Sequence, residues 1–235
     1  RNCLVGSEMC IRDRSNISKA NFYKNIEKSK KYIKQGDIFQ IVPSHRFEMD
    51  FDYNPTKLYE VLRETNPSPF MYLFNFPKFN IVGSSPEILV RVRDNTVTIR
   101  PIAGTRPRGS TKKQDIKNEM DLLKDAKEIS EHMMLLDLGR NDVGRVVKPG
   151  TVKVTSSFSI ERYSHVMHIV SNVEGQLKSN KTLIDALMAG FPAGTVTGAP
   201  KIRAMQIIDE LEVTKRGPYA GAVGYFSSMN EMDTC

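Results

Sequence analysis

Apolar residues recur at helical spacing in several stretches of the chain, which predicts amphipathic helices. The first stretch follows Ser18, a residue type that caps helices, and stops at Gly36. The second follows Asn54 and has Pro55 in its first turn, where proline is well tolerated. The predicted helices span residues 19–35, 55–64, 113–138, 183–189 and 201–211.

Runs rich in β-branched and aromatic residues predict strands between these helices. Pro43 interrupts the first run and indicates a bulge or a sheet edge. Asp94-Asn95 is typical of a hairpin turn. The predicted strands span residues 39–49, 71–76, 80–83, 88–93, 96–100, 151–157, 165–176 and 220–227, and residues 104–110 are predicted to form a loop. Because the strands come in blocks and do not alternate with helices, the order favours an α+β fold.

The length of 235 residues suits one domain with a sizeable core. Residues 1–14 show neither a helical nor a strand period, so we treat them as a segment foreign to the fold and assign the domain to residues 15–235. The chain stops at Cys235, directly after a strand-like run. We therefore expect a domain that is incomplete at both ends and truncated at its C-terminus.

Charge and cysteine usage exclude several classes of protein. The 34 Lys and Arg exceed the 27 Asp and Glu, but the bases are scattered and lack interleaved aromatics, which argues against nucleic-acid binding. Apolar runs are too short for a membrane span. Cys3, Cys10 and Cys235 lie at the chain ends, which excludes a disulfide scaffold and a cysteine zinc site. This usage suits a reducing compartment, the cytoplasm or, in a plant or alga, the plastid.

Two acids stand one helical turn apart in the longest predicted helix. Glu128 and Glu131 share one face and offer hard oxygen ligands for Mg²⁺; a solvated acidic face is the alternative. Leu135 and Leu138 lie on the same side, which indicates that this face is covered. The opposite core-facing stripe is predicted to consist of Leu122, Ile129, Met133 and Leu136.

Other candidates are each ambiguous by themselves. The segment from Pro101 to Gly109 offers backbone N–H groups, Thr105 and two arginines to a carboxylate, or it is a basic surface turn. Glu87 could act as a general acid if its pKa were raised, or it simply precedes a strand. His168 is either an active-site group or a structural strand histidine. The glycine-rich segment 190–198 lacks the signature of a nucleotide-binding loop and reads as an anion site or a helix-entry turn.

Taken together, these segments resemble the chorismate-binding enzymes, a family that includes anthranilate, aminodeoxychorismate, isochorismate and salicylate synthases. The resemblance extends over nearly everything from Gly36 onward, in the order found in the family. The matching strings are GDIFQIVPSHRF, NPSPFMYLF, GSSPEILV, PIAGTRPRG, DAKEISEHMMLLDLGRNDVGRV, FSIERYSHVMHIVSNVEG, FPAGTVTGAPKIRAMQIIDELE and GPYAGAVGYF.

The resemblance implies a fold of antiparallel β-sheets in a sandwich flanked by helices, with chorismate as substrate and Mg²⁺ as cofactor. It implies that Glu128 and Glu131 are metal ligands and that Glu87 is the general acid. His168 and Thr105 would be catalytic. The substrate contacts implied by the resemblance are Gln40, Gly104, Thr105 and Tyr219, and the residues of a tryptophan inhibitor pocket are Pro69, Phe70, Met71, Val223 and Tyr225.

Two positions distinguish branches of the family. Members that add water tend to have lysine where this chain has Gln40, which points to ammonia as the nucleophile. Aminodeoxychorismate synthases typically have lysine where this chain has Ala103, which favours the anthranilate synthase branch. Aminodeoxychorismate synthase and a non-catalytic chorismate-binding homologue are the alternatives.

The anthranilate synthase branch further implies a glutamine amidotransferase partner that supplies ammonia, and inhibition of the full-length protein by L-tryptophan. In the family a second carboxylate pair follows the point where this chain stops. We therefore expect little or no activity from the fragment by itself.

Overall fold

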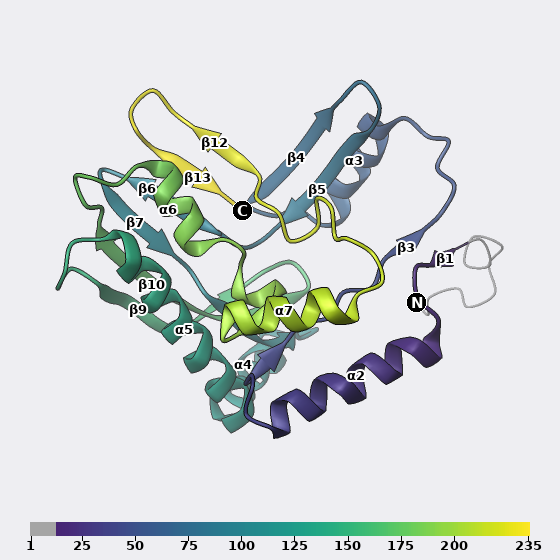
Figure 1. The fold of residues 1–235 in the computed structure, drawn as a ribbon, viewed down its shortest axis with the longest axis horizontal. Helices are drawn as coiled ribbons and strands as arrows, with labels where there is room; N and C mark the ends of the chain where they lie inside the picture. Colours follow the sequence, from purple (N-terminus) through teal and green to yellow (C-terminus); the bar gives the residue numbers. More distant parts are fainter. Residues whose placement is uncertain (1–12) are drawn as a thin grey trace. The chain divides into compact units, whose positions relative to one another are not determined.

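The computed structural model describes residues 13–235, so Cys3 and Cys10 lie outside the described residues. The chain divides into two compact units. Unit 1 comprises the described residues up to Asn54 together with Val196–Tyr219, and unit 2 comprises Pro55–Thr195 together with Ala220–Cys235. Figure 1 shows the elements of both units. The predicted start of the domain at residue 15 stays a prediction.

Helices and strands occur in the blocks that the sequence predicts. The helices are α2 (Lys19–Lys34), α3 (Pro55–Thr65), α4 (Lys112–Lys124), α5 (Ala126–Val146), α6 (Leu183–Gly190), η1 (Gly194–Val196) and α7 (Lys201–Leu211). The first strands are β1 (Arg14–Ser15), β2 (Gln40–Ile41), β3 (Phe47–Glu48), β4 (Phe70–Asn75), β5 (Asn80–Ser85), β6 (Val90–Arg93) and β7 (Thr96–Ile99). The remaining strands are β8 (Ile102–Pro107), β9 (Lys153–Arg162), β10 (Val166–Gln176), β11 (Gly198–Ala199), β12 (Gly224–Phe226) and β13 (Met232–Thr234).

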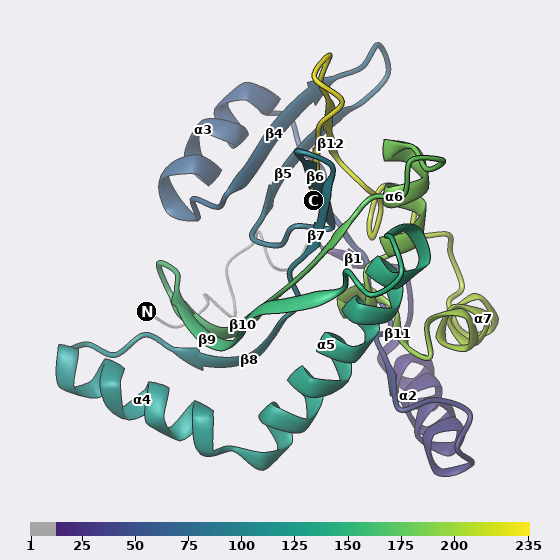
Figure 2. The ribbon, with the colours of Figure 1, turned by 90° about the vertical axis from the view of Figure 1, so that its left-hand side faces the viewer.

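Unit 2 is built on a seven-stranded antiparallel sheet. Its strand order is β12-β13-β6-β7-β10-β8, and β9 pairs with β10. Helix α5 packs against β8 and β10, and α6 packs against β6 (Figures 1 and 2). The core between the helices and the sheet includes the fully buried side chains Val90, Val92, Val97, Val143 and Val173. The hairpin β4–β5 forms a separate antiparallel pair beside α3. Antiparallel sheets flanked by helices confirm the predicted α+β class.

Unit 1 contains helices α2 and α7 and two short strand pairs. The Oγ of Ser18 accepts a hydrogen bond from the backbone N–H of Asn21, as a helix cap does, and Gly36 follows the helix with φ of +82°. The core of this unit consists of Ile38, Ala204, Ile207 and Leu211. Strand β1 pairs with β3, and β2 pairs with β11, so Gln40 lies opposite Ala199.

The single long helix predicted over residues 113–138 is wrong. It is two helices, α4 and α5, separated at Asp125, whose backbone is extended with ψ of 106° (Figure 2). The Oδ1 of Asp125 accepts hydrogen bonds from the backbone N–H groups of Lys127 and Glu128, so this acid starts the second helix. One residue of the predicted core stripe does not face the core. Met133, predicted to be in the core, is 50% exposed, whereas His132 is fully buried.

The loop predicted over residues 104–110 is also wrong in its first half, because residues 102–107 form strand β8. Thr105 pairs with His168 and Ala103 with Ile169, so Gly104 is an extra residue that makes a bulge. Its φ of +79° is a conformation that glycine adopts without strain. The glycine that looked like a loop signal therefore marks an irregularity within a strand.

Two predicted strands are much shorter than expected. Residues 39–49 contain only the two-residue strands β2 and β3, with Pro43 between them. Here the backbone N–H of Ser44 donates to the side chain of Glu212, and that of Arg46 donates to the side chain of Asn16, in place of strand partners. The strand predicted over residues 220–227 shrinks to β12, which pairs with the unpredicted strand β13.

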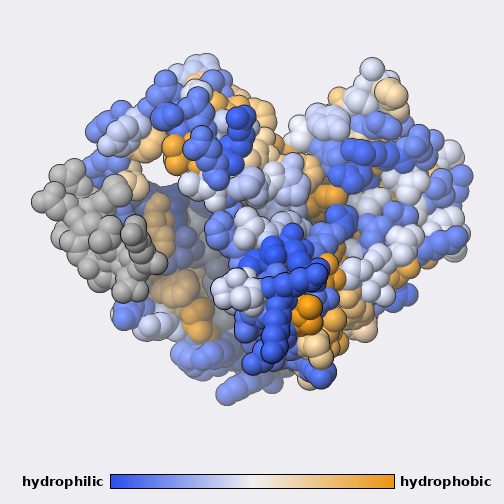
Figure 3. Space-filling model, turned by 180° about the vertical axis from the view of Figure 1, so that it is seen from behind, coloured by the Kyte–Doolittle hydropathy of each residue, from blue (hydrophilic) through white to orange (hydrophobic). Residues whose placement is uncertain are grey.

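Figure 3 shows apolar side chains in small separate groups on the face that it draws. Among residues 13–235 there is no helix long and apolar enough to cross a lipid bilayer.

Candidate functional site

Glu87 lies in unit 2 between β5 and β6, beside a small and mostly apolar cavity. The cavity has a volume of about 30 Å³, roughly enough for one water molecule. Its apolar walls include Ile99, Leu135 and Leu138. Burial beside these side chains raises the pKa of the Glu87 carboxyl to about 7, because the charged form loses its hydration. Near neutral pH a large share of the Glu87 side chains therefore carries a proton that can be donated.

Thr195 is the hydrogen-bond partner of this carboxyl group. Its hydroxyl, in the short helix η1, donates to Glu87 Oε2 at 2.9 Å and acts to lower the pKa of Glu87. Sequence reasoning missed Thr195, because the segment from Gly190 to Gly198 was interpreted only as an anion site or a helix entry. The signal was a hydroxyl residue among several glycines, where the chain can approach other segments closely.

Replacing Thr195 with valine, which keeps the shape and removes the hydroxyl, is expected to raise the pKa of Glu87 further. The carboxylate loses a donor that stabilises its charged form, whereas burial remains. The pKa is measured from the carboxyl ¹³C shift of Glu87 during a pH titration. Thr155→Val, on the exposed strand β9, is the control and should leave the titration unchanged. An unchanged or lowered pKa of Glu87 in Thr195→Val would contradict the assignment.

His168 and Thr105 meet across strands β10 and β8. The Nδ1 of His168 is 3.0 Å from the Thr105 hydroxyl and 3.3 Å from the carbonyl oxygen of Gly104. Because a carbonyl oxygen only accepts, this contact favours a proton on Nδ1 and a free lone pair on Nε2. Burial lowers the pKa of His168, which favours the neutral ring. Tyr163 packs edge-on against this ring, with centroids 5.4 Å apart.

Glu128 and Glu131 lie in the first two turns of α5, and both are half-buried. A Cβ placed on Gly104 would come within 3.4 Å of Glu128 Oε2, so this carboxylate lies across the bulge of β8. Leu135, on the same side of the helix, is buried as predicted. The bulge therefore brings Glu128 next to the strand segment that carries Thr105.

The two carboxylates fit part of a magnesium site. They are hard oxygen donors one helical turn apart, and Mg²⁺ is often bound by one or two carboxylates together with water and substrate oxygens. Within the described part of the chain, no cluster of three or more His, Cys, Asp or Glu side chains is arranged to hold a metal. The chain thus offers a pair of ligands, and the remaining coordination positions would fall to other groups.

His132 was also missed by sequence reasoning. It is fully buried, and its Nε2 is 2.7 Å from the hydroxyl oxygen of Ser171 on β10. That oxygen also accepts a hydrogen bond from the backbone N–H of Phe158, so the Ser171 hydroxyl joins α5 to two strands of the sheet. Burial lowers the pKa of His132 and favours the neutral ring. The pair fixes α5 against the sheet and thereby fixes the helix that carries Glu128.

Gln40 and Tyr219 belong to unit 1. Gln40 lies in β2 opposite Ala199, and Tyr219 is 52% exposed, with the Arg216 guanidinium 5.6 Å from its ring centroid. Arg216 itself bonds both carboxylate oxygens of Glu212 and the carbonyl oxygens of Val42 and Val196. The guanidinium that lies over the ring of Tyr219 is thus itself held by four hydrogen bonds.

The residues predicted to form a tryptophan pocket lie in unit 2. Pro69, Phe70 and Met71 are at the start of β4, and Val223 and Tyr225 are at β12. The two segments are linked through Cys235 and Ser85. The backbone of Val223 pairs with that of Cys235, whose thiol bonds Ser85, and Ser85 is the strand partner of Phe70.

Unit 2 thus contains an acid with a raised pKa, a histidine with a lowered pKa and a pair of carboxylates on one helix. The profile of the chorismate binding enzymes covers residues 7–235. The chain therefore belongs to the chorismate-binding enzyme family.

Individual relatives point to one branch of this family. The chain is 62% identical over 222 residues to anthranilate synthase component 1 of Cereibacter sphaeroides, a match that covers 94% of this chain and 44% of the relative. It is 59% identical over 221 residues to the protein of that name from Pseudomonas putida, covering 94% of this chain and 45% of the relative. The chain thus spans about half the length of the curated relatives that it matches.

Solved structures agree with the fold. Anthranilate synthase component I from Streptococcus pneumoniae superposes with a TM-score of 0.89 at 45% identity, over 95% of this chain and 49% of that one. A menaquinone-specific isochorismate synthase from Escherichia coli superposes with a TM-score of 0.85 at 24% identity, over 95% of this chain and 52% of that one. At that identity the second likeness shows the fold alone.

Proposed function

We propose that this chain is part of the catalytic domain of an anthranilate synthase large subunit, which converts chorismate and ammonia to anthranilate and pyruvate in tryptophan biosynthesis. The observation that carries the proposal is the Glu87 carboxyl, whose pKa of about 7 allows it to hold a proton at neutral pH. Loss of the ring hydroxyl of chorismate requires such a proton, because hydroxide is a poor leaving group. The names of the relatives support the choice of branch.

In this mechanism Glu87 donates its proton to the departing hydroxyl, which leaves as water while ammonia bonds to the ring. The free Nε2 of His168 is suited to accept a proton as the ring loses pyruvate and becomes aromatic. Thr105 orients that histidine through its hydroxyl. Glu128 and Glu131 would hold Mg²⁺, which anchors a substrate carboxylate when bound. Gln40, Gly104 and Tyr219 are assigned to substrate binding.

Ammonia would come from glutamine through a partner amidotransferase. L-Tryptophan would inhibit the full-length protein by binding near Phe70, Met71 and Tyr225. We also propose that the 235 residues alone turn over little or no chorismate, because the described residues supply just a pair of carboxylates for the metal.

The test uses a chimera in which this chain replaces the matching segment of the Cereibacter sphaeroides relative. With chorismate, ammonium and Mg²⁺, we expect the fluorescence of anthranilate to appear in the chimera and not with the chain alone. Glu60→Gln, on the exposed side of α3, is the control substitution and should leave turnover intact. A folded chimera that releases aminodeoxychorismate or isochorismate would overturn the choice of branch, and one without any chorismate turnover would overturn the enzyme proposal.

A further inference from the structure

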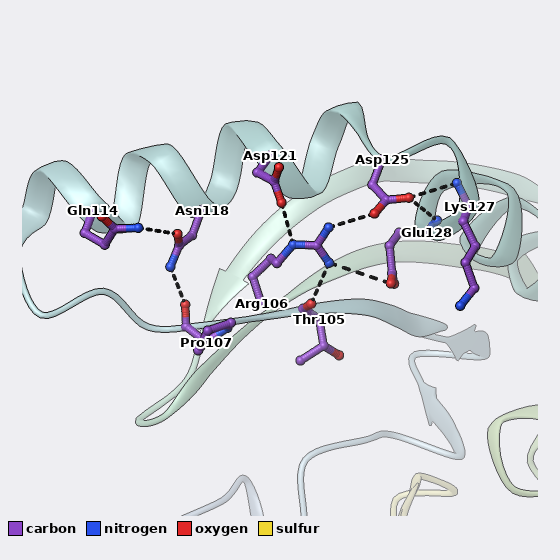
Figure 4. Close-up of polar contacts among 9 residues, drawn as sticks. All are labelled: Thr105, Arg106, Pro107, Gln114, Asn118, Asp121, Asp125, Lys127 and Glu128. Carbon is purple, nitrogen blue, oxygen red and sulfur yellow. Dashed lines mark hydrogen bonds and ion pairs between the residues drawn. The ribbon is translucent and has the colours of Figure 1, made fainter.

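Arg106 follows Thr105 in strand β8, and its guanidinium contacts several segments at once (Figure 4). Its Nε donates to Asp121 Oδ2 of α4 at 2.7 Å, and its Nη2 donates to Asp125 Oδ2 at 2.7 Å. Its Nη1 donates to the carbonyl oxygen of Thr105 at 3.0 Å. One side chain thus joins β8, α4 and the residue between α4 and α5.

Asp125 uses its two carboxylate oxygens for different tasks. Oδ1 accepts from the backbone N–H groups of Lys127 at 3.0 Å and Glu128 at 3.3 Å, whereas Oδ2 faces Arg106. The hydrogen bond from Arg106 lowers the pKa of Asp125, so the cap stays ionised. Because the cap defines the first turn of α5, the guanidinium fixes where that turn begins relative to β8.

Glu128 is in this first turn. Its Oε1 is 3.7 Å from Arg106 Nη1, a distance that makes an ion pair and is too long for a hydrogen bond. Its Oε2 lies beside Gly104 on the bulge. The start of the helix and the adjacent guanidinium together therefore place the Glu128 carboxylate, and both depend on Arg106.

We propose that Arg106 is a positioning residue that holds the Glu128 carboxylate in place for a divalent cation. This inference rests on the proposed function only in taking Glu128 and Glu131 as the metal ligands. Arg106 is not itself a metal ligand, because a guanidinium has donors and no acceptor. Arg106 acts on Glu128 in two ways, through the start of α5 and through the ion pair at 3.7 Å.

Lysine cannot replace arginine in this role. A guanidinium is a planar fork with donors in fixed directions, and an ammonium is a single point that cannot reach the two acids and the Thr105 carbonyl together. Arg106→Lys therefore keeps the charge and removes the geometry. Arg108→Lys is the matched control, because Arg108 is two residues away and forms a similar fork with Asp115 and the Tyr163 carbonyl.

The first measurement is the affinity of the 235-residue chain for Mn²⁺, followed by electron paramagnetic resonance as a probe for Mg²⁺. We expect Arg106→Lys to weaken binding about tenfold, the size usual for residues that orient a metal ligand. Arg108→Lys should leave the Mn²⁺ affinity close to that of the parent chain, because Arg108 bonds Asp115 and the Tyr163 carbonyl and is not a partner of Asp125. Asp121→Asn, which removes a partner of Arg106 that is not a candidate ligand, should weaken binding by an intermediate factor.

The second measurement needs no metal. Hydrogen exchange of the Lys127 and Glu128 amides should be faster in Arg106→Lys and unchanged in Arg108→Lys, because only the first substitution loosens the Asp125 cap. Unchanged exchange, or equal effects of both substitutions on exchange or on Mn²⁺ affinity, would overturn the proposal; so would tighter Mn²⁺ binding in Arg106→Lys. Failure of both the parent chain and the chimera to bind Mn²⁺ would overturn the metal assignment itself, and the exchange result would still decide whether Arg106 fixes the start of α5.

Discussion

Replacing Glu87 with glutamine is expected to abolish most turnover of the chimera while making the chain more stable at neutral and higher pH. Glutamine has nearly the same shape and can still accept the hydrogen bond from Thr195, but it has no acidic proton. Loss of a general acid typically lowers the rate about 100-fold or more. The activity is measured as anthranilate formation from chorismate and ammonium.

The gain in stability follows from the direction of the pKa shift. The pKa of Glu87 is about 7 in the folded chain, above its ordinary value of 4.5, so the folded state holds this proton more tightly than the unfolded state. The contribution of this bound proton to the free energy of unfolding is fully present below pH 4.5. It is lost as the pH rises through 7, by up to about 3 kcal/mol. Glu87→Gln should remove this decline.

Urea unfolding of the 235-residue chain at pH 5 and pH 8 measures how much unfolding free energy is lost between these two pH values. The parent chain should lose more unfolding free energy between these values than Glu87→Gln does. Glu60→Gln, an exposed acid in an ion pair, should follow the parent chain. Full turnover by the glutamine variant would remove Glu87 from the mechanism, and a loss of stability at pH 8 would show that its ionised form is well solvated.

Replacing Gly198 with alanine is expected to unfold much of unit 1. Gly198 has φ of +142°, and a Cβ at this position would overlap the carbonyl oxygen of Gln40 on the paired strand. The obstacles are the carbonyl oxygen and carbon of Gln40, and these backbone atoms cannot move aside as the end of a flexible side chain can. We expect the free energy of unfolding to fall by about 4 kcal/mol or more, an exceptional effect for a single substitution.

Gly36→Ala separates the cost of backbone strain from the cost of atomic overlap. Gly36 also has a positive φ, of +82°, but a Cβ there would meet no atom within 4 Å. That substitution should cost only the backbone strain, about 1 to 2 kcal/mol. Thermal unfolding of both variants gives the comparison. Equal losses at the two glycines would mean that the approach of Gln40 to Gly198 is unimportant.

The order of elements was largely predictable because it depends on local signals. Ser18, Pro55 and the Asp94-Asn95 turn mark boundaries through their own backbone preferences, and these predictions are confirmed. Periodicity could not reveal the division between α4 and α5. Asp125 is compatible with the interior of a helix, and it becomes a cap because Arg106, distant in sequence from the start of α5, bonds its other oxygen.

The candidate site was predictable in its residue types more than in its geometry. Glu87, Glu128 and His168 were recognised from motifs, and the structure places them all in unit 2. Their chemical states depend on partners contributed by other elements. The pKa of Glu87 reflects the apolar walls of a cavity, and Thr195 reaches it from a segment more than a hundred residues away. No window of sequence contains both groups.

The bulge in β8 has a consequence for how this strand tolerates insertions and deletions. Without Gly104, Ala103 and Thr105 would be consecutive and would still face Ile169 and His168, so the ladder with β10 would be complete. The sheet therefore gains nothing from the additional residue. What the glycine adds is a carbonyl oxygen turned towards the His168 ring and room for the Glu128 carboxylate. A relative with a one-residue deletion at this position should keep its fold and lose the preference for one histidine tautomer.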